Sequence, residues 1–356
     1  MKSHPYANIP ARGHWRRSIS TVPYAEVDPV GTPRFNIGRE DKVATAGSCF
    51  AQHIARHLKG SGFCYYVAED AHPVFPPHLA QMFNFGLFSA RYGNIYTSRQ
   101  LVQLFERAHG QFLPEEEAWV ESDGSYVDPF RPTCNPGGFA SLPELRGDRN
   151  QHLAAVRRMF RELDVFVFTL GLTECWRARS DGATYPVCPG TAGGTFDPAK
   201  YEFVNLTADE VIADLRKFLG YLAAVNPSAR VVLTVSPVPL VATAEDRHVL
   251  ASTTLSKAVL RVAADVVSHE YTNVAYFESY EIITGNFNRG RYFAEDLRSV
   301  TEEGVSHVMR LFLKHYAGVE SSQPEPAAAP APAQDSHMAD MQRAMAVICD
   351  EEALDR

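Results

Sequence analysis

The chain has 356 residues, of which 45% are hydrophobic and 21% charged, and its formal net charge is −8. This composition supports a full hydrophobic core. The negative balance argues against a nucleic-acid partner, which would need clustered Lys and Arg. The first residues lack the apolar core of a secretory signal, and no apolar run is long enough to span a membrane. The six cysteines are scattered without a Cys-x-x-Cys pair, as is typical of reduced thiols. We therefore expect a cytoplasmic protein with neither a membrane nor a nucleic-acid partner.

Short apolar runs alternate with amphipathic segments between residues 40 and 318, which is the pattern of a parallel sheet with helical crossovers. Five strands are predicted, at Lys42–Ala46, Phe63–Val67, Asp164–Leu170, Arg230–Ser236 and Asn273–Phe277. Six helices are predicted, at Phe50–Lys59, Arg99–His109, Gln151–Leu163, Ala208–Val225, His248–Glu270 and Thr301–Tyr316. The sequence thus predicts an α/β fold built on a five-stranded parallel sheet.

Three regions stand outside this alternation. Residues 1–39 are expected to form an N-terminal arm. Residues 68–149 are rich in Pro, Gly and aromatic side chains, and we interpret them as a loop-rich insertion between the second and third strands. Residues 319–335 form a Pro/Ala-rich linker that cannot bury a core of its own.

Beyond the linker, residues 336–356 are expected to form an amphipathic helix. Its apolar side chains recur at helical spacing, at Met338, Met341, Met345 and Ile348. Two interpretations remain open: a surface helix that folds back on its own domain, and a docking helix for a protein partner.

Ser48 is the first candidate for chemistry. It follows a strand of small residues that ends in Gly47, and a predicted helix begins two residues later, at Phe50. A serine in this position projects from the carboxyl end of a strand, where open α/β sheets form their binding crevices. The backbone N–H groups at the start of the helix can stabilise an oxyanion. The structural alternative is that Ser48 only caps the helix.

Two further segments are expected at the same edge of the sheet. Gly171, Thr173 and Glu174 directly follow the strongest predicted strand, and Asp296 precedes the last helix. A carboxylate at Asp296 is suited to orienting an imidazole base. The alternatives are a turn with Thr173 as a helix cap, and a solvated Asp near a helix N-terminus.

Together these residues carry a family resemblance. The chain resembles the GSCFA family, a branch of the SGNH/GDSL hydrolases, over residues 40–316. The motifs are GSCFA at Gly47–Ala51, TLGLTECW at Thr169–Trp176, TVSPVPLVAT at Thr234–Thr243, the pair Ser256-Lys257, and YFESYEI at Tyr276–Ile282. The resemblance implies a three-layer flavodoxin-like fold and Ser48 as nucleophile. It also implies an oxyanion hole made by the Ser48 amide, a glycine matched by Gly93, and a third residue in the Gly171–Thr173 block.

The chain departs from the superfamily at two positions. Thr173 stands where SGNH enzymes carry Asn, and its hydroxyl can still donate one hydrogen bond. Asp296, Ser299 and Gly304 match the spacing of the block Asp-x-x-His followed five residues later by Gly, so Ser299 takes the place of the catalytic His. Without an imidazole, Ser48 is a weak nucleophile. Ser299-x-x-Glu302 also matches a capping box for the last helix.

Other histidines are candidates for the missing base. His307 is the nearest in sequence to Gly304, but the apolar stripe of its helix predicts that it faces solvent. His53 and His57 have the i, i+4 spacing of a metal-binding pair, although no third ligand is evident. His72 follows the second strand, at the same edge of the sheet. We expect neither a metal nor a cofactor.

Two functions follow from the sequence. The first is a serine esterase or O-acyltransferase that acts on acyl esters, in particular acetyl esters of a small molecule or a carbohydrate, through an acyl-Ser48 intermediate. The second is a catalytically silent protein that keeps the cleft for a glycan or ester ligand, which the absent His favours.

Overall fold

The computed structural model describes residues 4–318 together with Asp350. Its central sheet has four parallel strands, in the order β1 (Val43–Gly47), β4 (Val165–Leu170), β8 (Arg230–Val235) and β9 (Val274–Tyr276). Every residue of β1 and β4 is buried, as expected of parallel strands covered on both faces. The α/β fold with a parallel sheet is therefore confirmed.

The prediction of five strands was wrong, because Phe63–Val67 does not form a strand. It makes one isolated parallel bridge, between Tyr65 and Val43. Beyond this point the backbone bonds to the insertion instead, with the Ala68 N–H donating to the Ser89 carbonyl oxygen at 2.7 Å. The segment leaves the edge of the sheet before a ladder can form.

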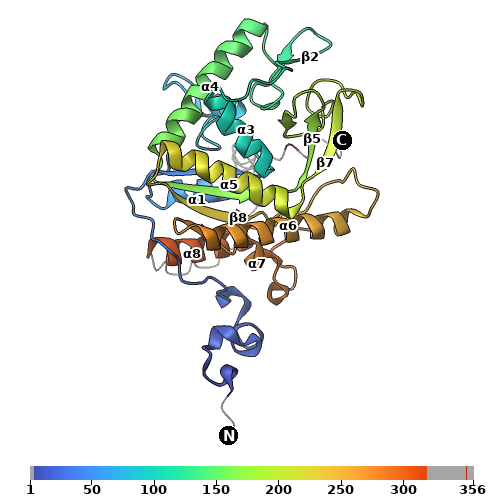
Figure 1. Ribbon diagram of the computed structural model, residues 1–356. Coiled ribbons are helices and arrows are strands. Elements are labelled where there is room, and N and C mark those ends of the chain that lie inside the picture. Colours follow the sequence, from blue (N-terminus) through green and yellow to red (C-terminus); the bar gives the residue numbers. More distant parts are fainter. Residues whose placement is uncertain (1–3, 319–349, 351–356) are drawn as a thin grey trace, which may run out of the picture.

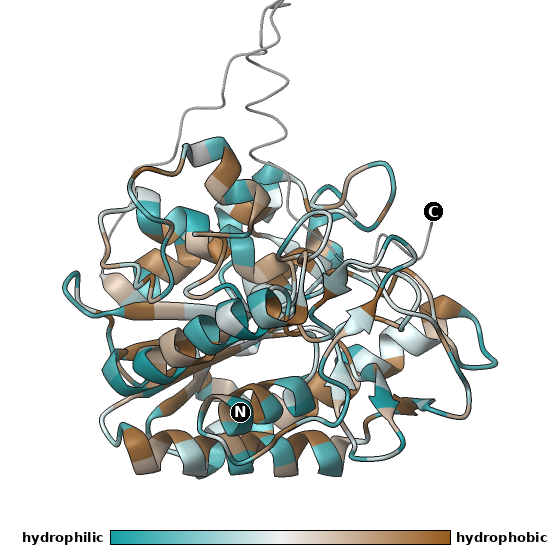
Figure 2. Ribbon diagram, turned by 90° about the horizontal axis from the view of Figure 1, so that it is seen from above, coloured by the Kyte–Doolittle hydropathy of each residue, from teal (hydrophilic) through white to brown (hydrophobic). Residues whose placement is uncertain are grey.

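Helices cover both faces of the sheet (Figure 1). One face packs against α1 (Phe50–Gly60), α7 (Ser279–Thr284) and α8 (Glu302–Ala317), and the other against α3 (Ser98–Ala108), α4 (Leu142–Glu162), α5 (Ala208–Val225) and α6 (Val249–Glu270). The side chains of β4 alternate between the two cores, since successive residues of a strand point to opposite faces. The strands of the sheet are largely hydrophobic, whereas the helices also carry hydrophilic residues (Figure 2).

The predicted helices agree with the structure, with one large difference in a boundary. α5 has the predicted bounds, and Thr207 caps it in a reciprocal capping box with Glu210. α4, however, begins at Leu142 rather than at Gln151, because Ser141 accepts a hydrogen bond from the Glu144 N–H and caps the helix there.

The sequence analysis did not predict the short helix and the small antiparallel sheets outside the central sheet. The insertion contains α2 (Pro77–Met82) and a hairpin of β2 (Trp119–Val120) and β3 (Tyr126–Val127). A second sheet follows β4, with the order β6 (Thr184–Tyr185), β5 (Glu174–Ala178), β7 (Tyr201–Asn205). Most of these strands are too short for an alternating pattern to be recognised.

The N-terminal arm carries four short helical turns, η1 (Pro5–Asn8), η2 (Ala11–Gly13), η3 (Arg16–Ser20) and η4 (Tyr24–Glu26). In Figure 1 its first part projects from the body of the molecule. Its last part is fixed to α8, where Asp28 pairs with Lys314 and His315. The predicted linker and C-terminal helix lie outside the described residues, apart from Asp350. Within the described residues, no helix combines the length and apolar character needed to cross a membrane.

Candidate active site

The turn after β1 depends on Gly47. Its φ is +135°, and a Cβ atom at this position would lie 2.3 Å from the Thr169 carbonyl oxygen of β4. Only glycine therefore lets the end of β1 approach β4 so closely. The next N–H group, that of Ser48, donates to the same Thr169 oxygen at 3.1 Å. The N–H group of Ser48 therefore already forms a hydrogen bond with β4.

The Ser48 side chain is 3% exposed. Within the described part of the chain, its Oγ has no hydrogen-bond partner. The alternative that Ser48 caps α1 was wrong, because Cys49 holds the N-cap position and no side chain bonds there. Most buried side-chain hydroxyl groups in proteins form a hydrogen bond, so a buried hydroxyl without one needs an explanation. A catalytic role is one explanation.

Gly171 makes the space that Ser48 occupies. A Cβ atom on Gly171 would lie 3.0 Å from Ser48 Cβ and 2.9 Å from the Tyr96 carbonyl oxygen. The Gly171 N–H donates to that Tyr96 oxygen at 3.0 Å. Gly171 therefore allows the loop after β4 to pass close to Ser48. Its N–H group already forms a hydrogen bond and is not free to bind an oxyanion.

Gly93 lies beside the same turn. The N–H of Ile95, two residues on, donates to the Gly47 carbonyl oxygen at 2.8 Å and ties the two segments together. Gly93 has a φ of +67°, and none of the hydrogen bonds among the described residues uses its N–H. Of the amides expected in the oxyanion hole, that of Gly93 is available.

The neighbouring Asn94 was missed by the sequence analysis. Its Oδ1 accepts from Gln52 Nε2 at 3.2 Å, and its Nδ2 donates to Asp350 Oδ2 at 2.8 Å. Asp350 is 6% exposed, and burial raises its pKa. Asn94 belongs to the same RYGNIYT segment as Gly93, which was the signal available for finding it.

The side chains of Thr173 and Glu174 both form hydrogen bonds with neighbouring side chains. The Thr173 hydroxyl donates to Asn205 Oδ1 at 2.6 Å, and the Glu174 carboxylate accepts from Thr243 Oγ1 at 2.8 Å. Burial raises the pKa of Glu174. Glu174 lines a groove of about 210 Å³ that it shares with Leu172 and Trp176. The Asn-like role expected for Thr173 is not available while its hydroxyl bonds Asn205.

Two adjacent residues of α6 hold the loop after β4. Ser256 Oγ accepts from the Thr173 N–H at 3.0 Å, and Lys257 Nζ donates to the Gly171 carbonyl oxygen at 2.5 Å. Both side chains are buried. The sequence analysis used this pair only as a family motif, and the structure shows that it fixes the loop beside Ser48.

Asp296 is bonded within its own exposed turn. Its carboxylate accepts from the Arg298 and Ser299 N–H groups at 3.0 and 2.9 Å, and from the Ser299 hydroxyl at 2.5 Å. Partial burial works to raise the pKa of Asp296, but these hydrogen bonds lower it. The capping box predicted from Ser299 was wrong, because Thr301 caps α8.

His307 is 5% exposed, so the prediction that it faces solvent was wrong. Its Nδ1 lies 2.7 Å from the Tyr292 hydroxyl. The N-terminal arm covers this side of α8, where Arg310 donates to the Ala25 carbonyl oxygen. Burial, together with Arg310, lowers the pKa of His307 to about 4. A sequence pattern for one helix cannot show that another segment covers it.

Among the described residues, none of the other histidines forms a hydrogen bond with Ser48 Oγ. The Nδ1 atoms of His57 and His72 face the His53 carbonyl oxygen and the Val74 N–H. Burial lowers the pKa of His53 to about 4. Across the described residues, no group of three or more His, Cys, Asp and Glu side chains is arranged to hold a metal.

Comparisons with known proteins gave one clear result. The model of the GSCFA family matches residues 42–312. No curated protein matches the chain. Among solved structures, an acetyl xylan esterase from the rumen bacterium Butyrivibrio proteoclasticus is similar at 13% identity, with a TM-score of 0.30. That alignment covers 79% of this chain and 65% of the esterase, and a similarity this weak supports no functional argument.

Proposed function

The chain belongs to the GSCFA family, and from its site we propose that it is an SGNH-type ester hydrolase or acyltransferase with Ser48 as nucleophile. The observation that carries the proposal is the buried Ser48 hydroxyl, without a partner among the described residues, at the carboxyl end of the edge strand β1. Gly47 and Gly171 let the neighbouring backbone approach this turn closely, and a Cβ atom at Gly93 would meet no atom within 4 Å.

In the proposed reaction, Ser48 Oγ attacks the carbonyl carbon of an acyl ester, loses its proton and forms a tetrahedral intermediate. The Gly93 N–H is the proposed donor to the oxyanion, since the Ser48 and Gly171 amides are already bonded. The C–O bond to the alcohol then breaks, and the alcohol leaves with a proton. Water or an acceptor hydroxyl releases the acyl group from Ser48, and we propose acetyl esters of small molecules or carbohydrates as substrates.

Activation of the serine is the weak step. Among the described residues, no imidazole or carboxylate lies within hydrogen-bond distance of Ser48 Oγ. General-base assistance is typically worth about 10²–10⁴-fold in rate. We therefore propose a slow enzyme on simple esters, with Asp296 and His307 supporting the fold of their own segments.

Fluorophosphonate labelling tests this proposal, because it reports the nucleophilicity of the serine without requiring the natural substrate. We expect the wild type to be labelled at Ser48 and to hydrolyse p-nitrophenyl acetate, and Ser48→Ala to lose both. Ser61→Ala is a matched control, since the Ser61 hydroxyl donates to the His57 carbonyl oxygen at the other end of α1. Equal background signal in the wild type and in Ser48→Ala would refute the proposal.

A second candidate is a catalytically silent binding protein. It is favoured by Ser299 at the position of the usual His, and by the closed set of hydrogen bonds that Asp296 makes within its own turn. In that case Ser48 would remain unlabelled, and an ester or glycan ligand would still raise the melting temperature of Ser48→Ala.

A further inference from the structure

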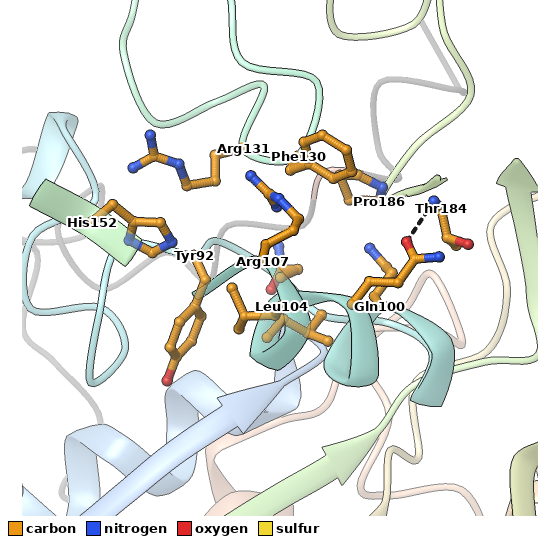
Figure 3. A pocket seen from close by; sticks show the side chains of 12 residues that line it. Tyr92, Gln100, Leu104, Arg107, Phe130, Arg131, His152, Thr184 and Pro186 are labelled. Carbon is orange, nitrogen blue, oxygen red and sulfur yellow. Dashed lines mark hydrogen bonds between the residues drawn. The ribbon is translucent and has the colours of Figure 1, made fainter. Parts of the chain in front are cut away.

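A small cavity lies on the α3 side of the sheet, and Asn94 and Ile95 of the segment beside the Ser48 turn also line it. It has a volume of about 20 Å³, enough for one monatomic ion or one water molecule. Its wall combines α3, the loop at residues 130–131 and α4 (Figure 3). Side chains of Arg107, Arg131 and His152 come from these three elements and line it together.

Each of these three side chains has a buried nitrogen with no hydrogen-bond partner in the described part of the chain. The atoms are Arg107 Nη2, Arg131 Nη1 and His152 Nε2. The exposed fractions of the three residues are 7%, 2% and 0%. Unsatisfied buried N–H groups of guanidinium ions are costly, and three orphan nitrogens around one cavity indicate a ligand there.

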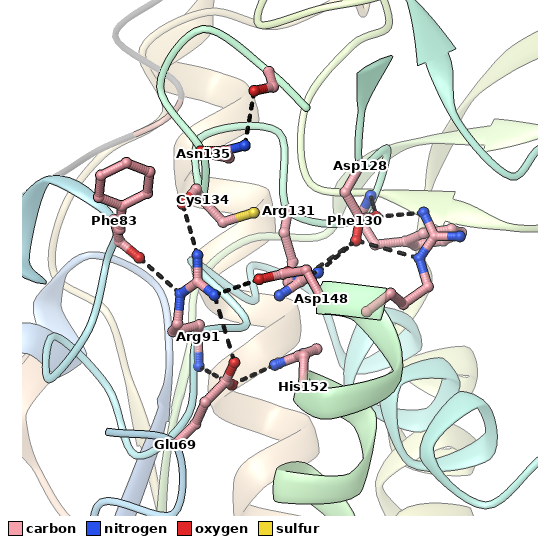
Figure 4. A network of polar contacts seen from close by, with 12 residues as sticks. Glu69, Phe83, Arg91, Asp128, Phe130, Arg131, Cys134, Asn135, Asp148 and His152 are labelled. Carbon is pink, nitrogen blue, oxygen red and sulfur yellow. Dashed lines mark hydrogen bonds and ion pairs between the residues drawn. The ribbon is translucent and has the colours of Figure 1, made fainter. Parts of the chain in front are cut away.

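Arg107 differs from the other arginines near the cavity in its ion pairs. Arg91, Arg131 and Arg149 form ion pairs with the carboxylates of Glu69, Asp128 and Asp148 (Figure 4). Arg107 is the fourth guanidinium, and no ion pair to it occurs among the described residues. It lies over the Phe130 ring, 3.7 Å from the centroid. Arg107 is therefore a buried cation that no carboxylate among the described residues pairs with, a costly arrangement without a counterion.

We propose that this cavity binds a monovalent halide, such as chloride, which accepts hydrogen bonds from Arg107 and Arg131 and supplies an anion to pair with the Arg107 guanidinium. A water molecule would satisfy the donors but would leave Arg107 without a paired anion. A neighbouring pocket of about 350 Å³ is also lined by Arg107 and Phe130. The proposal is independent of the function of Ser48.

His152 makes the binding sensitive to protons. Its Nδ1 lies 2.6 Å from Glu69 Oε2, and Arg131 and Arg107 are the other charged groups that face it. Burial and Arg131 lower the pKa of His152, so the empty site favours the neutral ring. A halide beside Nε2 favours the protonated ring. Halide binding should therefore take up a proton and strengthen as the pH falls from 8 to 6.

The test is thermal unfolding of the full chain in sodium chloride and in sodium gluconate at equal ionic strength. We expect a saturable rise of about 2–4 °C in the melting temperature that is specific to chloride and larger at pH 6 than at pH 8. Arg107→Met should abolish the difference between the two salts. Arg146→Met is the matched control, because Arg146 pairs with Glu117 at the surface, and it should keep the difference.

Equal melting temperatures of the wild type in the two salts would overturn the proposal. They would indicate that the cavity holds a water molecule and not a halide. If Arg107→Met does not fold, a wild-type crystal grown in sodium bromide decides the question. An anomalous bromide peak between Arg107 and Arg131 supports the site, and its absence overturns it.

Discussion

Two neighbouring regions of the molecule are built by opposite means. Around Ser48, the positions are set by backbone hydrogen bonds and by the small size of Gly47 and Gly171. Within the insertion, the positions are set by a buried network of ion pairs around Asp128 and Arg131. In the Ser48 region the side chains of Ser256 and Lys257 bond to backbone groups of the loop after β4, whereas the network consists almost entirely of charged side chains paired with one another.

This difference predicts which kind of substitution each region fails to tolerate. A site fixed by the backbone fails when a side chain is added, because no space is left for it. A buried ionic network fails when a charge is removed, because the partner charge stays buried without compensation. Substitutions that add a side chain should therefore affect the Ser48 region most, and substitutions that remove a charge should affect the ionic network most.

Asp128→Asn should have the largest effect. Asp128 is 1% exposed and accepts from Arg131 and Arg149, so its loss leaves two guanidinium groups short of a counterion. We expect the free energy of unfolding to fall by about 3–5 kcal/mol, measured by denaturant titration. Glu117→Gln breaks the exposed pair with Arg146 and should cost at most about 1 kcal/mol. Similar costs for the two variants would show that the network is not the main support of the insertion.

Acid should affect the helix layer that contains α1 and the ionic network at different pH. The pKa of His307, in the helix layer that also contains α1, is lowered to about 4, so the unfolded chain binds more protons between pH 6.5 and 4. Stability from this group is present above pH 6.5 and is lost as the pH falls to 4, by at most about 3 kcal/mol. Despite its burial, His152 and Arg131 hold the pKa of Glu69 at about 2, so that contribution is lost only between pH 4.5 and 2.

His307→Gln isolates the first of these contributions. Unfolding curves at pH 7, 5.5 and 4 should show a smaller loss of stability for the variant than for the wild type. An unchanged slope would mean that the imidazole is protonated in the folded protein without cost.

The same contrast explains what the sequence could reveal. The strand–turn–helix at Ser48 is local, and Gly47, Ser48 and the start of α1 were predicted from adjacent residues. The ionic network joins residues far apart in the chain, such as Glu69 and His152, and no local pattern indicates it. The burial of His307 was missed for the same reason, since the covering segment comes from the other end of the chain.

Gly171→Ala tests the Ser48 region directly. The added Cβ would lie 3.0 Å from Ser48 Cβ and 2.9 Å from the Tyr96 carbonyl oxygen, neither of which can move freely. We expect a loss of about 1–3 kcal/mol in stability and a clear loss of fluorophosphonate labelling. Gly220→Ala, in α5, meets no atom within 4 Å and should stabilise the protein slightly while labelling is retained. Full labelling of Gly171→Ala would show that Ser48 does not depend on this close contact.

Asp296→Ala should have the smallest effect, and it decides whether Asp296 belongs to the catalytic set. Its carboxylate accepts only from Arg298 and Ser299 of its own turn among the described residues, so removing it should cost about 1 kcal/mol. The rate of Ser48 labelling should then fall by less than tenfold, since no imidazole depends on this carboxylate. A fall of a hundredfold or more, at unchanged stability, would instead show that Asp296 orients a base toward Ser48. The site would then depend on a charged pair, as the network within the insertion does, and the contrast between the two regions would fail.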